Sequence, residues 1–392
     1  MKKVVITHAK RTPIGSFGGT LASFTAAQLG SFAIKAVLEE SGIDKSKVDE
    51  VIFGNVLMAG QGQAPARQAA IYAGLPDTVE TMTLNKMCGS GLKAIMLAHQ
   101  AILAGDADVI IAGGMESMSN APYLLPKGRN GFKYGHGEIL DSVLLDGLTD
   151  VYNKIHMGNC AEICAKNMTI TREELDEFAI NSYTKAQTAQ KEGRFKEEMV
   201  PLVLKTKAGE TIIDKDEDPE KTNFAKIPTL RPVFDKEGVV TAANASNLND
   251  GAAAVLVMSE EEALELGYKP LVEIVAQSSA AKAPVDFTIA PADAIHKVLN
   301  KADLTVKDID LYEINEAFAV VSIAVNRLTG ISTENTNVNG GAIALGHPIG
   351  ASGARIVATL VHEMVKRNST YGLASLCIGG GEASAMIVKK YE

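Results

Sequence analysis

The chain has 392 residues, of which 46% are hydrophobic and 22% charged, and its formal net charge is −9. This length supplies ample material for large buried cores and favours two or more domains. The negative charge offers no basic field for nucleic acid or for an anionic membrane surface, so we expect the protein to bind neither.

Cysteine usage and apolar runs narrow the class of protein further. The four cysteines, Cys88, Cys160, Cys164 and Cys377, show no paired spacing typical of a metal site, and a disulfide framework is not expected at this size. We therefore predict no metal ion. The first residues read as a strand rather than a signal or transit segment, and no apolar run reaches the roughly 18 residues of a membrane span. These features predict a cytoplasmic protein.

Strand-like and helical patterns alternate along the first part of the chain. We expect strands at 3–8, 48–56, 81–85 and 106–114, and helices at about 25–41, at 63–74 and after Cys88. Gly42 is the stop signal of the first of these helices. Near-continuous apolar strands that alternate with helices are typical of an α/β fold.

Cys88 stands where a tight turn opens a buried helix. Gly89 and Gly91 follow it and allow close backbone approach, and the free N–H groups of the helix start carry about half a positive charge. That field favours thiolate over thiol, so the pattern predicts an unusually nucleophilic cysteine. A cysteine beside a packing glycine is more often an ordinary core residue, and only the rest of the chain decides between the two readings.

The same order of elements returns near the C-terminus. Residues 304–316 repeat the pattern of 43–55, and a loop that contains His347 opens a helix as the Cys88 loop does. The strand at 372–381 then matches the one at 106–114 and also runs into glycines. Such a long period indicates a duplicated domain rather than a solenoid. Two equivalent halves would place Cys88 and His347 at equivalent helix starts, facing one shared cleft.

The stretch between the two halves differs from both. It mixes polar helices, one of them with a capping-box start at Thr171, with loops rich in Gly, Lys and Asp. It reads as an insertion that covers the cleft and binds the non-reacting part of a substrate. We predict an N-terminal core half at 1–118 and 244–268, an inserted loop domain at 119–243 and a C-terminal core half at 269–392.

Five motifs together resemble the thiolase family. They lie at 85–91, 156–158, 315–318, 340–350 and 377–381, in the order and approximate spacing of that family. The resemblance runs from the first strand to the last. It implies duplicated α/β core domains in a five-layered αβαβα arrangement, with an inserted loop domain that binds coenzyme A.

The resemblance also suggests a branch within the family. His156 before Met157 is similar to the biosynthetic branch, acetyl-CoA C-acetyltransferase, where the degradative branch more typically has proline. That branch condenses two acetyl-CoA reversibly to acetoacetyl-CoA and coenzyme A through an acetyl-Cys88 intermediate. The alternative is a degradative 3-ketoacyl-CoA thiolase that acts on longer chains.

A Claisen condensation of two thioesters requires a nucleophile, a base and donors for two developing oxyanions. Cys88 is suited to carry the acyl group, and His347 is the natural base for Cys88. Cys377 ends a buried strand at three glycines, where a second thiol would face the cleft and shuttle the α-carbon proton.

The remaining roles are those that the resemblance implies. One oxyanion pocket falls to the N–H groups of Cys88 and Gly379, and the other to His347 with a water held by Asn315. Glu316 is expected to support Asn315 from behind. Substrate contacts are expected from Leu148, His156, Met157, Ser246, Ala317 and Phe318.

The chain departs from the family pattern at several places. Glu220 stands where an arginine often contacts the nucleotide phosphates, so Lys221, Lys226 or Arg231 are the substitutes we expect. Glu382 follows the glycine run at 379–381 in place of a smaller residue. None of these changes touches the three reacting side chains.

Partners and competing functions follow from the same resemblance. We expect acetyl-CoA, acetoacetyl-CoA and coenzyme A as substrates, no separate cofactor, a homotetramer or dimer, and a place in fatty acid metabolism. A decarboxylating ketosynthase or a hydroxymethylglutaryl-CoA synthase relative would share the fold, but Cys377 and the run at 315–318 disfavour it. A non-catalytic acyl-CoA or lipid carrier would have no need for Cys88, His347 and Cys377 together.

Overall fold

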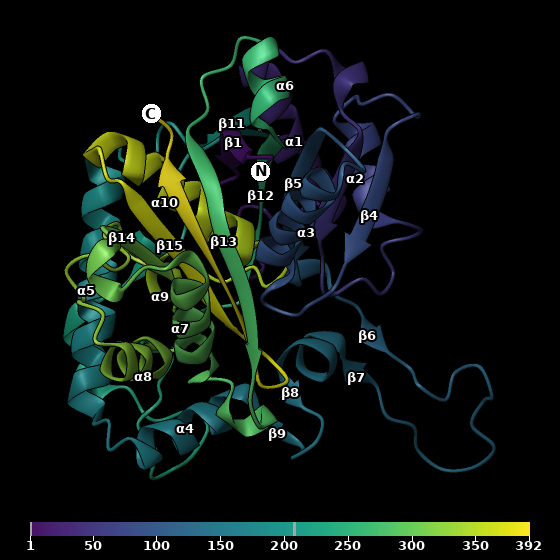
Figure 1. Cartoon of the computed structure of the whole chain (residues 1–392). Coiled ribbons are helices and arrows are strands. Elements are labelled where there is room, and N and C mark those ends of the chain that lie inside the picture. The colour runs from purple at the N-terminus through teal and green to yellow at the C-terminus, as the bar shows by residue number, and fades with distance from the viewer. Residues whose placement is uncertain (1, 207–208) are drawn as a thin grey trace.

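The computed structural model describes residues 2–206 and 209–392 (Figure 1). The first part alternates strands and helices as the sequence predicts. Its elements are β1 (Val4–Arg11), β2 (Gly15–Ser16), α1 (Ala26–Ser41), β3 (Glu50–Gly54), α2 (Pro65–Tyr72), β4 (Glu80–Leu84), α3 (Ser90–Ala104) and β5 (Val109–Ser117). Gly42 ends α1 in the left-handed conformation, with φ of 64°.

The chain then passes through a region of short strands and two longer helices. Its elements are β6 (Tyr123–Leu124), β7 (Leu140–Asp141), a π-helical turn (Val143–Leu148), β8 (Thr149–Asp150), β9 (Ile155–His156), α4 (Met157–Asn167), α5 (Arg172–Lys191), β10 (Leu202–Thr206) and β11 (Gly209–Ile213). The expected capping box at the start of α5 is confirmed, because Thr171 and Glu174 bond each other's backbone N–H groups.

The last part of the chain first adds one strand and one helix to the first half and then repeats the order of elements of that half. Its elements are β12 (Asn249–Ser259), α6 (Glu260–Glu265), β13 (Val272–Ala281), α7 (Ala290–Ala302), β14 (Leu311–Ile314), α8 (Ala319–Thr329), α9 (Ala342–Leu345), α10 (Ser352–Arg367), β15 (Tyr371–Ile378) and β16 (Glu382–Lys390). The domain boundaries given above stay a prediction.

The strand order confirms the duplication. One sheet runs β14-β15-β16-β13-β1-β12-β5-β3-β4, with β2 attached to β12. Its two halves meet at a short antiparallel contact, where Val5 pairs with Glu273 and Ile6 with Val272. Outward from that contact, β1-β12-β5-β3 matches β13-β16-β15-β14. An isolated parallel bridge between Tyr312 and Thr336 stands where β4 pairs in the other half.

Three apolar clusters define the layers. The central cluster joins α3 and α10 to strands of both halves, through residues such as Leu92, Ile95, Ile356 and Leu360. A second cluster packs α1 and α2 on the outer face of the N-terminal half, and a third packs α4, α5, α7 and α8 on that of the C-terminal half. The order of helix, sheet, helix, sheet and helix is the five-layered arrangement that we expected (Figure 1).

One expectation about apolar runs is wrong. The 18 residues Met87–Ala104 are apolar and long enough, by length and composition, to cross a membrane. This segment contains α3, which packs between the two halves of the sheet. A helix that packs against protein on most of its sides has apolar residues all round, and this explains the composition of Met87–Ala104.

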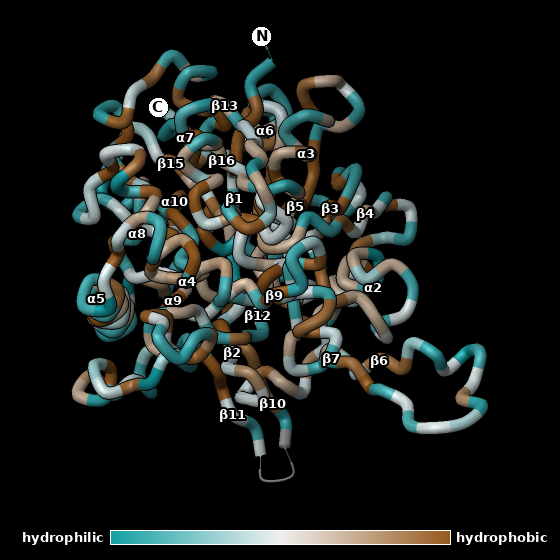
Figure 2. The backbone as a smooth tube through the Cα atoms, turned by 90° about the horizontal axis from the view of Figure 1, so that it is seen from below, coloured by the Kyte–Doolittle hydropathy of each residue, from teal (hydrophilic) through white to brown (hydrophobic). Residues whose placement is uncertain are grey.

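A projecting arm is the main departure from a closed shape. Both views show the segment between β6 and β7 standing away from the layered body (Figures 1 and 2). Several of its apolar side chains are exposed, among them Tyr123, Leu125, Tyr134 and Ile139.

Candidate active site

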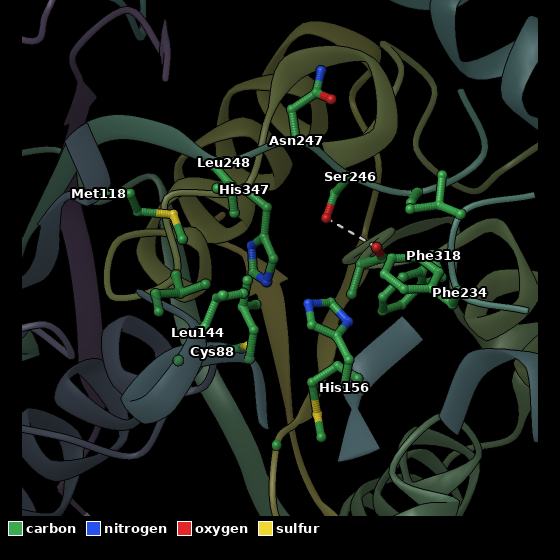
Figure 3. Close-up of a pocket in the computed structure, with 18 of the residues that line it drawn as sticks. Cys88, Met118, Leu144, His156, Phe234, Ser246, Asn247, Leu248, Phe318 and His347 are labelled. Atoms are coloured by element: carbon green, nitrogen blue, oxygen red, sulfur yellow. Dashed lines mark hydrogen bonds between the residues drawn. The ribbon is translucent and has the colours of Figure 1, made fainter. Parts of the chain in front are cut away.

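A cavity of about 320 Å³ lies where the two halves and the intervening region meet. It contains nine of the eleven residues predicted from the sequence: Cys88, Leu148, His156, Met157, Ser246, Ala317, Phe318, His347 and Gly379. Cys377 and Asn315 are fully buried and do not line it. The predicted residues, which are far apart in the sequence, therefore gather at one place (Figure 3).

The Cys88 loop is a tight turn that leads into α3. The N–H of Gly89 donates to Lys86 O at 3.0 Å and that of Ser90 to Met87 O at 3.0 Å, while Met87 adopts a positive φ of 48°. Gly91 is required by packing, because a Cβ there would lie 2.6 Å from the Ala354 backbone nitrogen in α10. The helix of the other half thus fixes the loop in place.

The protonation state of Cys88 differs from the expectation. Part of the residue faces the cavity, yet burial raises the pKa of the Cys88 thiol to about 11, against the opposing effect of the N–H groups of Gly379 and of Cys88 itself. The start of the helix therefore does not hold a thiolate at neutral pH. The resting group is a thiol, and its activation depends on a base.

His347 is arranged to be that base. Its Nδ1 lies 2.6 Å from Ser352 Oγ, and Ser352 Oγ donates its own proton to Pro348 O at 2.9 Å. The hydroxyl must then accept from Nδ1–H, which leaves Nε2 with a free lone pair. Nε2 has no hydrogen-bond partner among the described residues. His347 and Cys88 both line the cavity, as Figure 3 shows.

His347 is also kept neutral. Burial lowers its pKa to about 3, and the nearby Arg355 charge lowers it further. Its backbone N–H donates to Asn249 Oδ1 at 2.9 Å, which holds the loop against β12. A neutral thiol and a neutral imidazole therefore face one apolar cavity, ready to exchange a proton when a substrate arrives.

Cys377 lies near the end of β15 and is completely buried. Burial raises the pKa of its thiol well above the ordinary value, and the charge of Cys88 raises it further. The second contribution places Cys377 within electrostatic reach of Cys88. Cys377 is therefore a second thiol near Cys88, but it does not line the cavity, whereas the sequence predicted that it faces the cleft, because β15 and its neighbours bury it completely.

Asn315 follows β14 with its backbone N–H bonded to Ser375 O at 2.9 Å. Its side-chain Oδ1 and Nδ2 are both buried and have no partner within the residues that the structure describes. Buried amides are almost always hydrogen-bonded, so this side chain is set up to hold a water or a substrate atom. Glu316 instead faces away and accepts from Ser182 Oγ at 2.6 Å and Asn337 Nδ2 at 2.8 Å.

The far wall of the cavity is aromatic. His156 caps α4, because its Nδ1 accepts from the N–H of Gly158 at 2.9 Å, and its ring stacks on Phe234 at 4.7 Å between centroids. Phe318 lies edge-on to both Phe234 and Phe287, with centroids 6.3 Å apart in each case. This wall gives the cavity an apolar lining that suits a short acyl group and its linker.

Comparison with known proteins identifies the family. The model described as "Thiolase, N-terminal domain" matches residues 4–261, and "Thiolase, C-terminal domain" matches residues 268–390. The chain belongs to the thiolase family.

Full-length relatives are similar throughout this thiolase. An acetyl-CoA acetyltransferase of Cupriavidus necator is 52% identical over 392 residues, which cover all of both chains. A mitochondrial acetyl-CoA acetyltransferase of Bos taurus is 51% identical over all of this chain and 92% of its own. The crystal structure of Acat5 thiolase from Ascaris suum in complex with coenzyme A superimposes with a TM-score of 0.94, at 43% identity, over 99% of this chain and 100% of that one.

One supporting residue of this thiolase was missed in the sequence. Glu116, at the end of β5, accepts from Asn55 Nδ2 at 2.7 Å, from Val56 N at 3.0 Å and from Gly350 N at 2.9 Å. Its carboxyl group thus ties the first half to the loop that carries His347. The sequence feature that could have pointed to this role is a glutamate at the end of an otherwise apolar strand.

Other residues that line the cavity also escaped prediction. They are Met118, Leu144, Gly147, Val233, Phe234, Thr241, Ala242, Ala245, Leu248 and Ile349. They are apolar or small, and no motif distinguishes them from core residues.

Lys221, Lys226 and Arg231 remain candidates for phosphate contacts. Glu220 lies 3.7 Å from Lys215, and Lys221 is held by Glu217 and Ser16, each at 2.7 Å. Lys226 and Arg231 are exposed. Which of them contacts a nucleotide stays a prediction.

Proposed function

We propose that this thiolase is an acetyl-CoA C-acetyltransferase, which condenses two acetyl-CoA reversibly to acetoacetyl-CoA and coenzyme A. The observation that carries the proposal is that the Cys88 thiol and His347, whose Nε2 has no partner among the described residues, line one apolar cavity, with two N–H groups directed at the sulfur. Full-length relatives with about half of their residues identical bear the name acetyl-CoA acetyltransferase.

In the first half of the reaction, Cys88 Sγ attacks the thioester carbonyl while His347 Nε2 takes its proton. The negative oxygen of the tetrahedral intermediate accepts from the N–H groups of Cys88 and Gly379, the two groups that already approach the sulfur. The carbon–sulfur bond to coenzyme A then breaks, and Cys377 gives its proton to the leaving thiolate. This leaves acetyl-Cys88, an imidazolium at His347 and a thiolate at Cys377.

In the second half, the Cys377 thiolate removes a proton from the methyl group of a second acetyl-CoA. Burial raises the pKa of this thiol, which makes its thiolate a strong base. The enolate oxygen accepts from protonated His347 and from a water held by Asn315. The enolate carbon attacks acetyl-Cys88, and His347 returns its proton to the departing Cys88 sulfur, so all three groups regain their starting states.

The cavity also bears on chain length. Phe234, Phe287 and Phe318 form a continuous edge-to-face wall, and Met157 closes the space beside Gly379. Each methylene that does not fit costs about 1–3 kcal/mol when the walls cannot move. We therefore favour a short-chain substrate over the longer substrates of a degradative 3-ketoacyl-CoA thiolase.

We further propose a homotetramer or dimer that acts in the cytoplasm in fatty acid metabolism, without a separate cofactor. Exposed apolar side chains on the arm between β6 and β7 support an assembly, since such patches usually meet a partner surface.

Thiolysis assays test the main proposal. The rate of acetoacetyl-CoA cleavage by coenzyme A should exceed the rates with six-carbon and eight-carbon 3-ketoacyl-CoA substrates. Faster cleavage of the longer substrates would replace the proposal with the degradative alternative. No cleavage of any of the three would instead favour a non-catalytic acyl-CoA carrier.

A further inference from the structure

The two N–H groups that approach Cys88 Sγ come from different halves of the chain. One belongs to Cys88 itself, and the other to Gly379 in the turn between β15 and β16. An oxyanion hole works only when both donors point at one position, so the two loops must be held in register. The contacts between the two loops therefore decide whether the two donors stay aligned.

The Cys88 loop is held by its own backbone hydrogen bonds and by packing against α10, so the turn that contains Gly379 is the looser of the two. Met87 has a positive φ of 48°, a conformation that a non-glycine residue adopts at a cost. On the other side, Gly380 and Gly381 have φ of 94° and 92°, and a Cβ at Gly380 would touch nothing within 4 Å. The turn is anchored at Gly381, whose O accepts from Lys282 N at 2.7 Å, and is open at Gly380, where a glycine leaves the backbone free to move.

Two contacts join the loops to each other. Gly89 presses against Ile378, so closely that a Cβ at Gly89 would lie 2.4 Å from Ile378 Cδ1. Beyond it, Lys86 Nζ forms an ion pair with Glu382. Lys86 precedes Cys88 by two residues, and Glu382 directly follows the glycine run and pairs with Ile378 in the β15–β16 register.

We propose that the ion pair between Lys86 and Glu382 is a positioning contact, which holds the Gly379 N–H in line with the Cys88 N–H. Its two residues sit at the outer ends of the two donor loops and connect the halves across the oxyanion pocket. Both side chains are only partly exposed, at 23% for Lys86 and 41% for Glu382, so the pair is less hydrated than a free surface pair.

A second lysine nearby means that losing Glu382 and losing Lys86 should have unequal effects. Lys93, in the first turns of α3, is close enough for the charge of Lys86 to lower its pKa, in addition to the effect of burial. Without Glu382, Lys86 would face Lys93 with no compensating charge and would be pushed out of its place. Without Lys86, Glu382 would merely turn towards water. Loss of Glu382 should therefore disturb the loops more than loss of Lys86.

The test is a mutant cycle on acetoacetyl-CoA thiolysis, and it rests on the proposed function. We expect Glu382→Gln to lower kcat roughly tenfold with less than a twofold change in KM, short of the 10²–10³ lost with a whole oxyanion donor. Lys86→Met should lower kcat only two- to threefold, and the double variant should match Lys86→Met rather than multiply the losses. The charge-exchanged variant, Lys86→Glu with Glu382→Lys, should recover at least half of the kcat.

The control is Glu40→Gln, which breaks the ion pair of Lys10 and Glu40. That pair has similar exposure, 13% and 43%, at 2.6 Å, and it lies outside the cavity. It should leave kcat unchanged, and all variants should keep a melting temperature close to that of the native protein.

Several results would overturn the inference while leaving the proposed function intact. These are a Glu382→Gln kcat within twofold of native, multiplied losses in the double variant, or an equal loss in Glu40→Gln. If the native protein does not cleave acetoacetyl-CoA, the proposed function itself fails.

Discussion

Asn55 and Asn315 occupy matching places in the two halves, yet only the Asn55 side chain has a hydrogen-bond partner among the described residues. Each follows a strand of its half, β3 or β14, and is completely buried. Asn55 Nδ2 donates to Glu116 Oε1 at 2.7 Å, whereas both amide atoms of Asn315 lack a partner among the described residues. Asn55 Oδ1 also lacks a partner among the described residues, so the Asn55 amide is half engaged and the Asn315 amide is wholly free. Duplication thus supplies two equal scaffolds, and the second leaves the whole amide available for chemistry.

The loops at the starts of α3 and α10 also differ in the chemical groups that they supply. The Cys88 loop presents a thiol and its own N–H, while the His347 loop presents a base whose Nδ1 is bound by Ser352. Gly91 and Gly353 let α3 and α10 touch, since a Cβ at either would lie within 2.6 Å of the other helix's backbone. The two reacting groups are close because the two copies of one motif pack against each other.

The largest expected effect separates the two halves of the reaction. Cys88→Ala should abolish acetylation by acetyl-CoA as well as condensation, because no group remains to carry the acyl chain. Cys377→Ala should still become acetylated at Cys88, while its condensation and thiolysis rates fall about 10²–10⁴-fold, the usual contribution of general acid–base catalysis. Mass spectrometry of the peptide that contains Cys88 measures the acetylation, and a thiolysis assay measures the rate.

A Cys377→Ala enzyme that condenses at nearly the native rate would contradict this assignment. Cys377 would then be a packing thiol, and His347 would be the remaining candidate for the α-proton. Cys160→Ala is a suitable control, because that cysteine is equally buried but lies in α4, away from the cavity.

A crossed pair of substitutions tests the contrast between the two asparagines. Asn315→Ala should lower kcat by about 10- to 100-fold with little loss of stability, since it removes a side chain that has no hydrogen-bond partner among the described residues. Asn55→Ala should cost about 1–3 kcal/mol of unfolding free energy, because it removes a buried donor from Glu116. Denaturant unfolding and thiolysis rates of both variants provide the comparison. Equal effects of the two substitutions on both quantities would mean that the halves do not differ in this way.

The sequence predicted the parts of the site that local patterns encode. Glycines beside Cys88, His347 and Cys377 indicated tight turns and close helix packing, and the repeat brought those turns to one cleft. The hydrogen bond of Ser352 that fixes the His347 tautomer was not foreseen, and neither was the stacking of Phe234 on His156. Phe234 reaches His156 from a distant loop, and no local pattern encodes such a contact.

The prediction that Cys88 rests as a thiolate was wrong for a related reason. A helix start acts on a thiol through partial charges, but burial between two halves of the molecule acts more strongly here and raises the pKa to about 11. Burial is a property of the assembled layers, so the residues around Cys88 in the sequence could not reveal it.

The smallest expected effect concerns Glu116, the carboxyl group that ties the two halves together. Burial raises its pKa from 4.5 to about 7, against the backbone N–H groups that lower it. Between pH 4.5 and about pH 7, Glu116 keeps its proton in the folded protein, whereas the same group has released it in the unfolded chain. The stabilisation is therefore complete below about pH 4.5 and is lost as the pH rises through 7, at no more than about 1.4 kcal/mol per pH unit.

Glu116→Gln cannot titrate and should remove this contribution. The native protein should be the more stable of the two at pH 5, because glutamine leaves one backbone donor without an acceptor, and the difference in unfolding free energy should shrink towards pH 8. Glu173→Gln, at an exposed position of α5, should give a difference that does not change over the same range. A constant difference for Glu116→Gln as well would show that this carboxyl group is ionised throughout, held by its N–H donors, and that the link between the halves is a permanent negative charge.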